Sequence, residues 1–408
     1  MLQLFKRNKM FRVFLTYQFF SGIGGVMFSM FILLSVHLIY QNPVYTGIAG
    51  FLMAAPSILS FAVGPVVDRR NKITIMRITT FLEFVVLSLL AFTPLREYLG
   101  VLFMFAVIFT YNIAALFENP AGTALLPQIV LKDEIMEANS LIEIIAMTGG
   151  IIIGAVLLVS LGGDINFSFL YGFSAAFLVL AFIVSWFLKN TKSETAEKQP
   201  SANYVQDLKE GAGFIRRNIL LLILIAVVTM DFVGEIAYVN RPMFLEYHAG
   251  AQGYVLFTLM VLIGGIIGSY FMGVLGKKFK VGSLVFILLV LAGVSRIAFA
   301  LIVPIQIMGG LIATIVFAAL LEAVDIIFST LNQKIPPKNM VGRVDTISTT
   351  CISVFVALGA FLGGFLGNAV SDIGYIFIYQ GIGIIVVGVI MILMPSSRRL
   401  SKVDDIGK

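Results

Sequence analysis

The stretch 166–188, NFSFLYGFSAAFLVLAFIVSWFL, decides the fold class of this chain. It carries no charged residue. A helix needs roughly 20 apolar residues to cross a hydrocarbon core about 30 Å thick, so this stretch is long enough to span a membrane. Stretches of the same kind follow one another from Phe11 almost to Met394. The sequence therefore predicts an all-α polytopic membrane protein.

The composition agrees with lipid as the main solvent. Of the 408 residues, 59% are hydrophobic and only 12% are charged, and the mean hydropathy is +1.00. These values lie far outside the range of soluble globular domains. We expect twelve transmembrane helices, at roughly 11–39, 46–67, 73–94, 100–119, 138–161, 166–188, 218–241, 251–275, 281–303, 307–331, 346–369 and 374–394.

The positions of the basic residues predict the orientation. Lys and Arg are retained in cytoplasmic loops, and with a cytoplasmic N-terminus 25 of the 28 Lys and Arg residues fall on the cytoplasmic side. Both termini are then cytoplasmic, and we expect the bacterial cytoplasmic membrane. The first apolar run is too long for a signal-peptide core and should stay in the mature protein. The net charge of +6 is thus an orientation signal, with no nucleic-acid partner required.

The longest polar segment divides the spans six and six. We expect an N-terminal six-helix bundle at 1–188, a cytoplasmic linker at 189–217 and a C-terminal six-helix bundle at 218–408. Residues 204–217 of the linker can form an amphipathic helix at the membrane surface. The segments 64–69 and 126–135 match 273–278 and 331–340 at offsets of 209 and 205 positions. These matches favour two pseudo-symmetric halves, an organisation common in secondary transporters.

Small residues recur at four-residue steps in several spans. Close helix crossings in lipid depend on such residues. The pattern suits helices that rock against their neighbours, or equally helices that pack tightly without motion. The residues at four-residue steps include Gly150 and Gly154 in the fifth span, Gly264 and Gly268 in the eighth, and Gly359, Gly363 and Gly367 in the eleventh. The second span offers Gly47 and Gly50, which are also small but less regularly spaced.

Acidic residues within spans are candidates for function, because an ionised group inside a membrane is costly. Asp231 and Glu235 stand one turn apart in the seventh span, and Tyr238 continues their face. This pair suits proton coupling or recognition of a cationic substrate. The alternative is a structural cluster of hydrogen bonds or ion pairs between helices.

Other intramembrane charges lie in both halves. Glu322 and Asp325 form a polar face in the tenth span, and Asp325 follows Glu118 by 207 positions. We expect Glu118 and Asp325 to make gating contacts near helix ends, with capping or substrate contact as alternatives. Glu83 is a proton-site candidate if it faces the interior of the bundle, and Glu322 could assist. Arg296 needs a carboxylate partner or a route outward to the interface.

The loop after the second span carries a motif that resembles the major facilitator superfamily. Its family pattern appears as Gly64, Asp68, Arg69 and Lys72, although Asn71 replaces the usual Gly. Such a loop places an acid and several cations near helix ends, where they can hold the cytoplasmic side shut. We call these residues, with Glu143, the cytoplasmic latch. The alternative for the loop is a positive-inside anchor, and for Glu143 an interfacial residue.

The resemblance extends over essentially the whole chain. The segments 118–127 and 207–218 look like the branch that contains macrolide efflux proteins and the enterobactin exporter. The fourth span lacks the Arg common in proton-driven drug antiporters, and the fifth lacks the Pro of the exporter pattern. The resemblance implies alternating access, with a central cavity lined by Gln18 in the first span and Tyr111 in the fourth. Walls rich in Phe and Met favour an amphipathic or lipophilic small molecule.

These features predict a secondary transporter that exports a small molecule in exchange for protons, with Asp231 and Glu235 central and Glu83 or Glu322 assisting. Nutrient import and lipid movement between leaflets are alternatives, and a membrane receptor or enzyme is a rival class. The enzyme class lacks support, because His37 and His248 are isolated and Cys351 is the single cysteine. We expect no cofactor, no metal and no enzymatic activity. Membrane lipids should surround a monomer.

Overall fold

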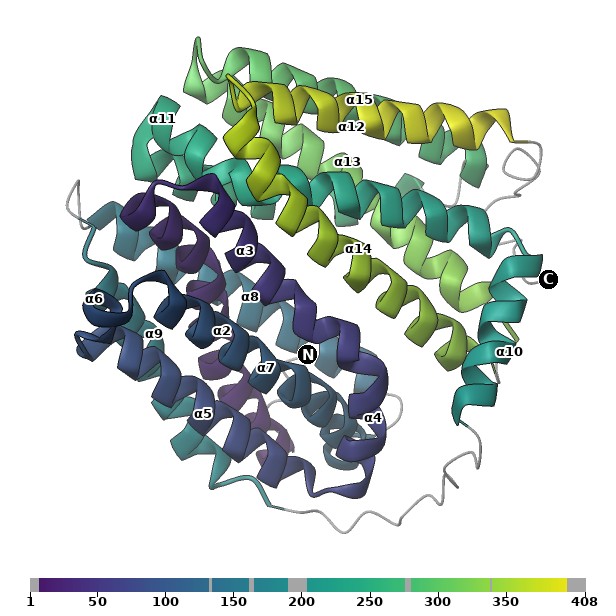
Figure 1. The fold of residues 1–408 in the computed structure, drawn as a ribbon. Coiled ribbons are helices and arrows are strands. Elements are labelled where there is room, and N and C mark those ends of the chain that lie inside the picture. Colours follow the sequence, from purple (N-terminus) through teal and green to yellow (C-terminus); the bar gives the residue numbers. More distant parts are fainter. Residues whose placement is uncertain are drawn as a thin grey trace. The chain divides into compact units, whose positions relative to one another are not determined.

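The computed structural model describes residues 7–131, 134–160, 165–189, 204–275, 280–337 and 340–394 (Figure 1). These residues form long helices joined by short connections. Within a membrane, a helix satisfies all of its own backbone polar groups, which explains why apolar runs of this length become helices. The helices before the linker are α2 (Lys9–Tyr40), α3 (Pro43–Ala54), η1 (Ala55–Leu59), α4 (Ser60–Arg69), α5 (Lys72–Phe92), α6 (Leu95–Leu99), α7 (Val101–Ile129), α8 (Ile135–Ser160) and α9 (Phe167–Ser185).

The remaining helices begin with the linker helix. This helix, α10, spans Tyr204–Arg217, the stretch that the sequence predicts to be helical. The others are α11 (Leu220–Leu275), α12 (Val281–Ile302), α13 (Ile307–Lys334), α14 (Val341–Ala369) and α15 (Gly374–Leu393). The 56-residue α11 is two helices in one, because Gly250 has non-helical backbone angles with φ +64°. Glycine adopts this left-handed region without steric cost, so the chain bends there.

The all-α membrane fold is confirmed. Ten stretches of the described residues are long and apolar enough to cross a membrane. One of them, Leu220–Met272, holds two spans joined at Gly250. The 26-residue α8 is a further apolar helix of membrane length. Within the described ranges these add up to the twelve spans that the sequence predicts.

Asparagine side chains fix where three helices start. Asn8 accepts a hydrogen bond from the Phe11 backbone at 3.0 Å, and Asn166 caps α9 through the Phe169 backbone at 3.1 Å. Asn71 accepts from the backbone N–H groups of Ile73 and Thr74 and so caps α5. The Asn that departs from the family motif therefore satisfies helix donors that a Gly side chain does not reach.

Contacts between helices group the chain into two units. The first unit comprises Met1–Gln41 and Ala55–Pro200, and the second comprises Asn42–Ala54 and Ser201–Lys408. In the first unit, α2 packs on α8 and α9, and α5 packs on α7 and α9. In the second, α11 packs on α13 and α14, and α12 on α15. Helix α3 comes early in the sequence but lies along α14 in the second unit (Figure 1).

Candidate functional site

A buried polar cluster in the first unit centres on Glu118 of α7. The Tyr17 hydroxyl and the Ser21 hydroxyl, both from α2, donate hydrogen bonds to the same Glu118 oxygen, each at 2.6 Å. Tyr17 also lies 2.6 Å from the Thr80 hydroxyl of α5. Because a phenol has one proton to donate and gives it to Glu118, Thr80 is the donor to Tyr17. Three helices thus converge on one carboxyl group.

A second carboxyl group joins this cluster. Glu83 of α5 is only 2% exposed, and its carboxyl hydrogen-bonds the carboxyl of Glu118, which is 7% exposed. A hydrogen bond between two carboxyl groups requires a proton on one of them. The pair is therefore a place where one proton can be held between two buried carboxyl groups. We call Glu83 and Glu118 the carboxyl pair.

The predicted cavity residues of the first unit lie around this pair. Tyr111 is within electrostatic reach of both carboxyl groups and packs on Phe28 with ring centroids 4.0 Å apart. Gln18 lies on the next position of α2, and its amide would be 3.8 Å from a Cβ added at Gly122 of α7. The described neighbours of Glu118 are the members of this cluster, and its expected gating role stays a prediction.

The second unit places its acids on α11 and α13. Asp231, Glu235 and Tyr238 are partly buried on α11, where Glu235 is within electrostatic reach of Asp231 and of Arg241. Asp325 interacts electrostatically with Asp231. Glu322 accepts a hydrogen bond from the Ser269 hydroxyl at 3.2 Å.

A pocket of about 200 Å³ opens beside Asp325. Helices α11, α13 and α14 enclose it, and Asp345 of α14 provides a second acid. Its polar lining also includes Ser329, Asn332, Ser348 and Thr349. Apolar side chains of α11, among them Ile223 and Val227, form the opposite part of the lining. The pocket is therefore amphipathic, and its two carboxyl groups come from α13 and α14.

The cytoplasmic latch is described only in part. The side chains of Gly64, Asp68, Arg69 and Glu143 lie outside the described residues. Lys72 follows the capping residue Asn71 in the first turn of α5 and is partly buried. The roles expected for these residues therefore stay predictions.

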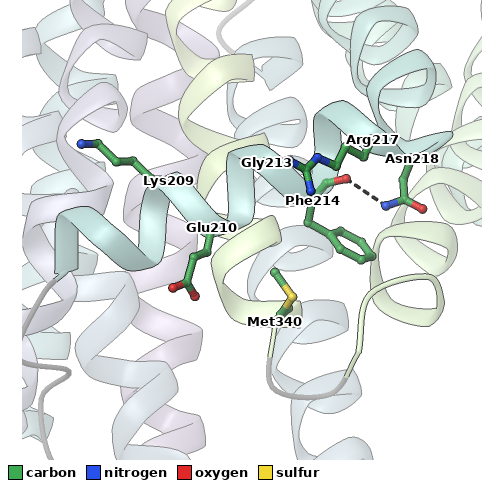
Figure 2. A pocket seen from close by; sticks show the side chains of 7 residues that line it. All are labelled: Lys209, Glu210, Gly213, Phe214, Arg217, Asn218 and Met340. Carbon is green, nitrogen blue, oxygen red and sulfur yellow. Dashed lines mark hydrogen bonds between the residues drawn. The ribbon is translucent and has the colours of Figure 1, made fainter.

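The linker helix α10 borders a larger pocket of about 510 Å³ (Figure 2). Lys209, Phe214 and Arg217 line it from α10, and Met340 lies across from them (Figure 2). The Asn218 amide donates to the Phe214 carbonyl at 2.9 Å. An ion pair of 2.6 Å between Glu210 and Arg343 connects α10 to the start of α14.

Sequence reasoning missed two members of the buried cluster. Tyr17 precedes Ser21 by four residues, so both lie on one face of α2, and this spacing was a usable signal. Thr80 lies three residues before Glu83 on α5 and shares its face in the same way. Nothing in the sequence pairs these faces across helices, because the register between two helices is set by tertiary packing.

Comparison with known proteins identifies the family of this chain. The sequence-family model of the Major Facilitator Superfamily matches residues 13–354. The chain belongs to the Major Facilitator Superfamily. Its superfamily fold is shared with a D-xylose–proton symporter, at a TM-score of 0.73 and 12% identity, over 95% of this chain and 97% of that one. A peptide transporter, POT, gives a TM-score of 0.73 at 13% identity, over 97% and 96% of the two chains.

Two relatives within the superfamily are described as exporters. The first is a bacilysin exporter, BacE, of Bacillus amyloliquefaciens, 26% identical over 77% of this chain and 78% of its own length. The second is the enterobactin exporter EntS of Salmonella paratyphi A, 25% identical over 100% of this chain and 98% of its own. The chain is thus a multi-pass membrane transporter of small molecules, and not an enzyme.

Proposed function

We propose that this transporter exports an amphipathic small molecule from a bacterial cell in exchange for protons. The carboxyl pair is the observation that carries the proposal. Two buried carboxyl groups that share a proton are a site at which protonation changes the local charge by a full unit inside a low-dielectric interior. A conformational change that gives water access to the pair, or that separates its two carboxyl groups, would release that proton.

The surroundings of the pair support this role. Tyr17 and Ser21 both donate to Glu118 and hold its carboxyl group in a fixed position between α2 and α7. We therefore assign Glu83 as the proton carrier and Glu118 as the group that keeps the Glu83 carboxyl in place.

The acids of the second unit are assigned to the cargo. Asp231, Glu235 and Asp325 lie close to one another and are more accessible than the carboxyl pair. The amphipathic pocket beside Asp325 suits an apolar molecule with a basic or hydroxyl group. Export is supported by the two relatives that are named as exporters, BacE and EntS. The cytoplasmic latch, the cytoplasmic membrane and the cytoplasmic termini complete the proposal.

The test is proton flux in proteoliposomes with an imposed pH gradient. A cargo panel of bacilysin, enterobactin, a macrolide and a lipophilic cation is added, and internal pH is followed with a dye. We expect at least one compound to trigger proton movement in the natural protein. Glu83→Gln should abolish this movement but retain exchange of labelled cargo across the membrane without a gradient, because exchange needs no net proton transfer.

Glu97→Gln serves as the matched control, since Glu97 is an exposed acid in the short helix α6. Unchanged gradient-driven flux in Glu83→Gln and in Glu118→Gln would remove the carboxyl pair from the mechanism. Silence of the folded natural protein toward the whole panel would instead favour nutrient import or lipid movement.

A further inference from the structure

A guanidinium group without a counter-ion lies in the interior of the second unit. Arg296 of α12 is 0% exposed. Its Nε donates to the Gln380 side-chain oxygen of α15 at 2.5 Å. Both of its terminal nitrogens, Nη1 and Nη2, are buried, and neither has a hydrogen-bond partner. The free edge of the guanidinium therefore carries unused donors that are shielded from water.

Aromatic rings enclose this guanidinium. Its central carbon lies 4.7 Å from the ring centroids of Phe317 and Phe377, 4.8 Å from that of Phe299 and 5.9 Å from that of Phe257. These rings come from four helices, α11, α12, α13 and α15. Contacts of a cation with ring faces return roughly 0.5–2 kcal/mol each, but they satisfy no N–H donor.

A second arginine lies beside the same rings. The central carbon of Arg241 in α11 is 4.6 Å from the Phe257 ring and 4.7 Å from the Tyr238 ring. Its Nε is also buried without a hydrogen-bond partner. Arg241 and Arg296 act on each other electrostatically, and like charges repel. The site therefore concentrates two cations and three unused donor nitrogens around Phe257.

Among the described residues, no carboxylate acts on Arg296. Glu235 is the acid within electrostatic reach of Arg241, and no acid of the described residues forms an ion pair with Arg296. A buried charge without a partner is strongly unfavourable, so natural proteins pair it. A negatively charged group that accepts two or more hydrogen bonds would satisfy these donors and offset the charge.

We propose that Arg296 and Arg241 form a binding site for a small anion inside the second unit. The Nη1 and Nη2 edge of Arg296 fits both oxygens of a carboxylate, or a single halide ion between them. The aromatic rings favour an anion with an apolar body. This site is separate from the carboxyl pair and goes beyond the proposed export function.

Two sources can supply such an anion, namely inorganic chloride and the carboxylate of an organic molecule. The test uses purified full-length protein in detergent, in a chloride-free gluconate buffer of constant ionic strength. Chloride and benzoate are titrated separately, and thermal unfolding is measured together with equilibrium binding of radioactive chloride or benzoate. We expect saturable binding and a rise in the unfolding temperature with at least one of them.

Arg296→Met should weaken that binding by about tenfold or more, as expected for loss of a bidentate charged contact. Arg217→Met, which removes an exposed arginine of α10, should bind as the natural protein does. Arg296→Lys keeps the positive charge but loses the two parallel N–H donors of the guanidinium. It should therefore weaken benzoate binding more than chloride binding. If Arg296→Met fails to fold, Arg241→Gln gives the same test from the second cation.

The outcomes separate cleanly. Binding of chloride alone identifies an inorganic anion site, and binding of benzoate alone identifies a site for an organic carboxylate. Absence of any saturable response in the folded natural protein would overturn the proposal. The proposal would also be overturned if the Arg296→Met and Arg241→Gln variants bound these anions as tightly as the natural protein does. Neither result bears on proton flux, so the export proposal is tested independently.

Discussion

Gly47 of α3 and Gly364 of α14 are in backbone contact, because a Cβ added to Gly47 would lie 2.5 Å from the Gly364 Cα. The contact continues along both helices. A Cβ at Gly50 would lie 2.5 Å from the Val239 side chain, and Asn240 donates to the Gly363 carbonyl at 2.7 Å. Small residues let these helices approach closely, as is typical of helix pairs in lipid.

Gly47→Val should therefore destabilise the protein. The added side chain meets backbone atoms, which have no rotamer to escape into, and overpacking of this kind costs about 1–3 kcal/mol. We expect a lower thermal unfolding temperature in detergent. Gly213→Ala in α10 is the control, since a Cβ there has no atom within 4 Å. A Gly47→Val protein as stable as the natural one would contradict the backbone contact.

The docking of α10 should depend on close packing more than on its ion pair. A Cβ at Gly211 would lie 2.6 Å from the Ile347 side chain and 3.2 Å from that of Arg343. The Glu210–Arg343 pair is partly exposed, at 49% and 32%, and exposed pairs contribute about 0–1 kcal/mol. Gly211→Leu should expose α10 to trypsin at its basic residues, whereas Glu210→Gln should change the cleavage rate little. A larger increase in cleavage for Glu210→Gln than for Gly211→Leu would show that the ion pair keeps α10 docked.

Tyr17→Phe should weaken the buried cluster without removing a carboxyl group. It deletes one of the two donors to Glu118 and leaves the Thr80 hydroxyl without its acceptor. A buried polar group left unsatisfied costs about 1–3 kcal/mol. Thermal unfolding in detergent measures this cost. Tyr98→Phe is the matched control, because Tyr98 is 80% exposed; equal effects of the two substitutions would argue against the cluster.

The double variant Asp231→Asn with Glu235→Gln should abolish transport driven by a pH gradient and leave folded protein in the membrane. These two partly buried acids of α11 stand one turn apart, and we assign them to cargo recognition. Cargo binding should therefore be lost together with flux, which distinguishes this variant from Glu83→Gln. Flux equal to that of the natural protein would exclude both acids from the mechanism.

The spans were predictable because lipid imposes a length and a composition on every helix. The stretch 166–188 became α9 at Phe167–Ser185, and 281–303 became α12 at Val281–Ile302. The break inside α11 was also visible as the gap between the seventh and eighth spans. Some helix ends were predicted less accurately. The fourth span was expected to end at residue 119, but α7 continues to Ile129 with Pro120 and Pro127 inside the helix.

The site was only partly predictable. Glu83 and Glu118 stood out singly, since an acid in an apolar span is rare. Their hydrogen bond joins α5 to α7, and neither sequence periodicity nor spacing fixes the rotation of one helix against another. Arg296 was recognised as a residue in need of a partner, but its enclosure by rings from four helices depends on packing alone. The amphipathic pocket beside Asp325 escaped sequence reasoning for the same reason.

The position of α3 has a consequence for biosynthesis. Gly364, the packing partner of Gly47, is translated more than 300 residues later. At roughly 5–20 residues per second, the glycine face of α3 waits on the order of 15–60 s for its partner. During that interval lipid or an assisting membrane protein must cover it. The early part of the chain therefore reaches its final packing only when synthesis is nearly complete, and a ribosome stalled before α14 would leave α3 unpaired.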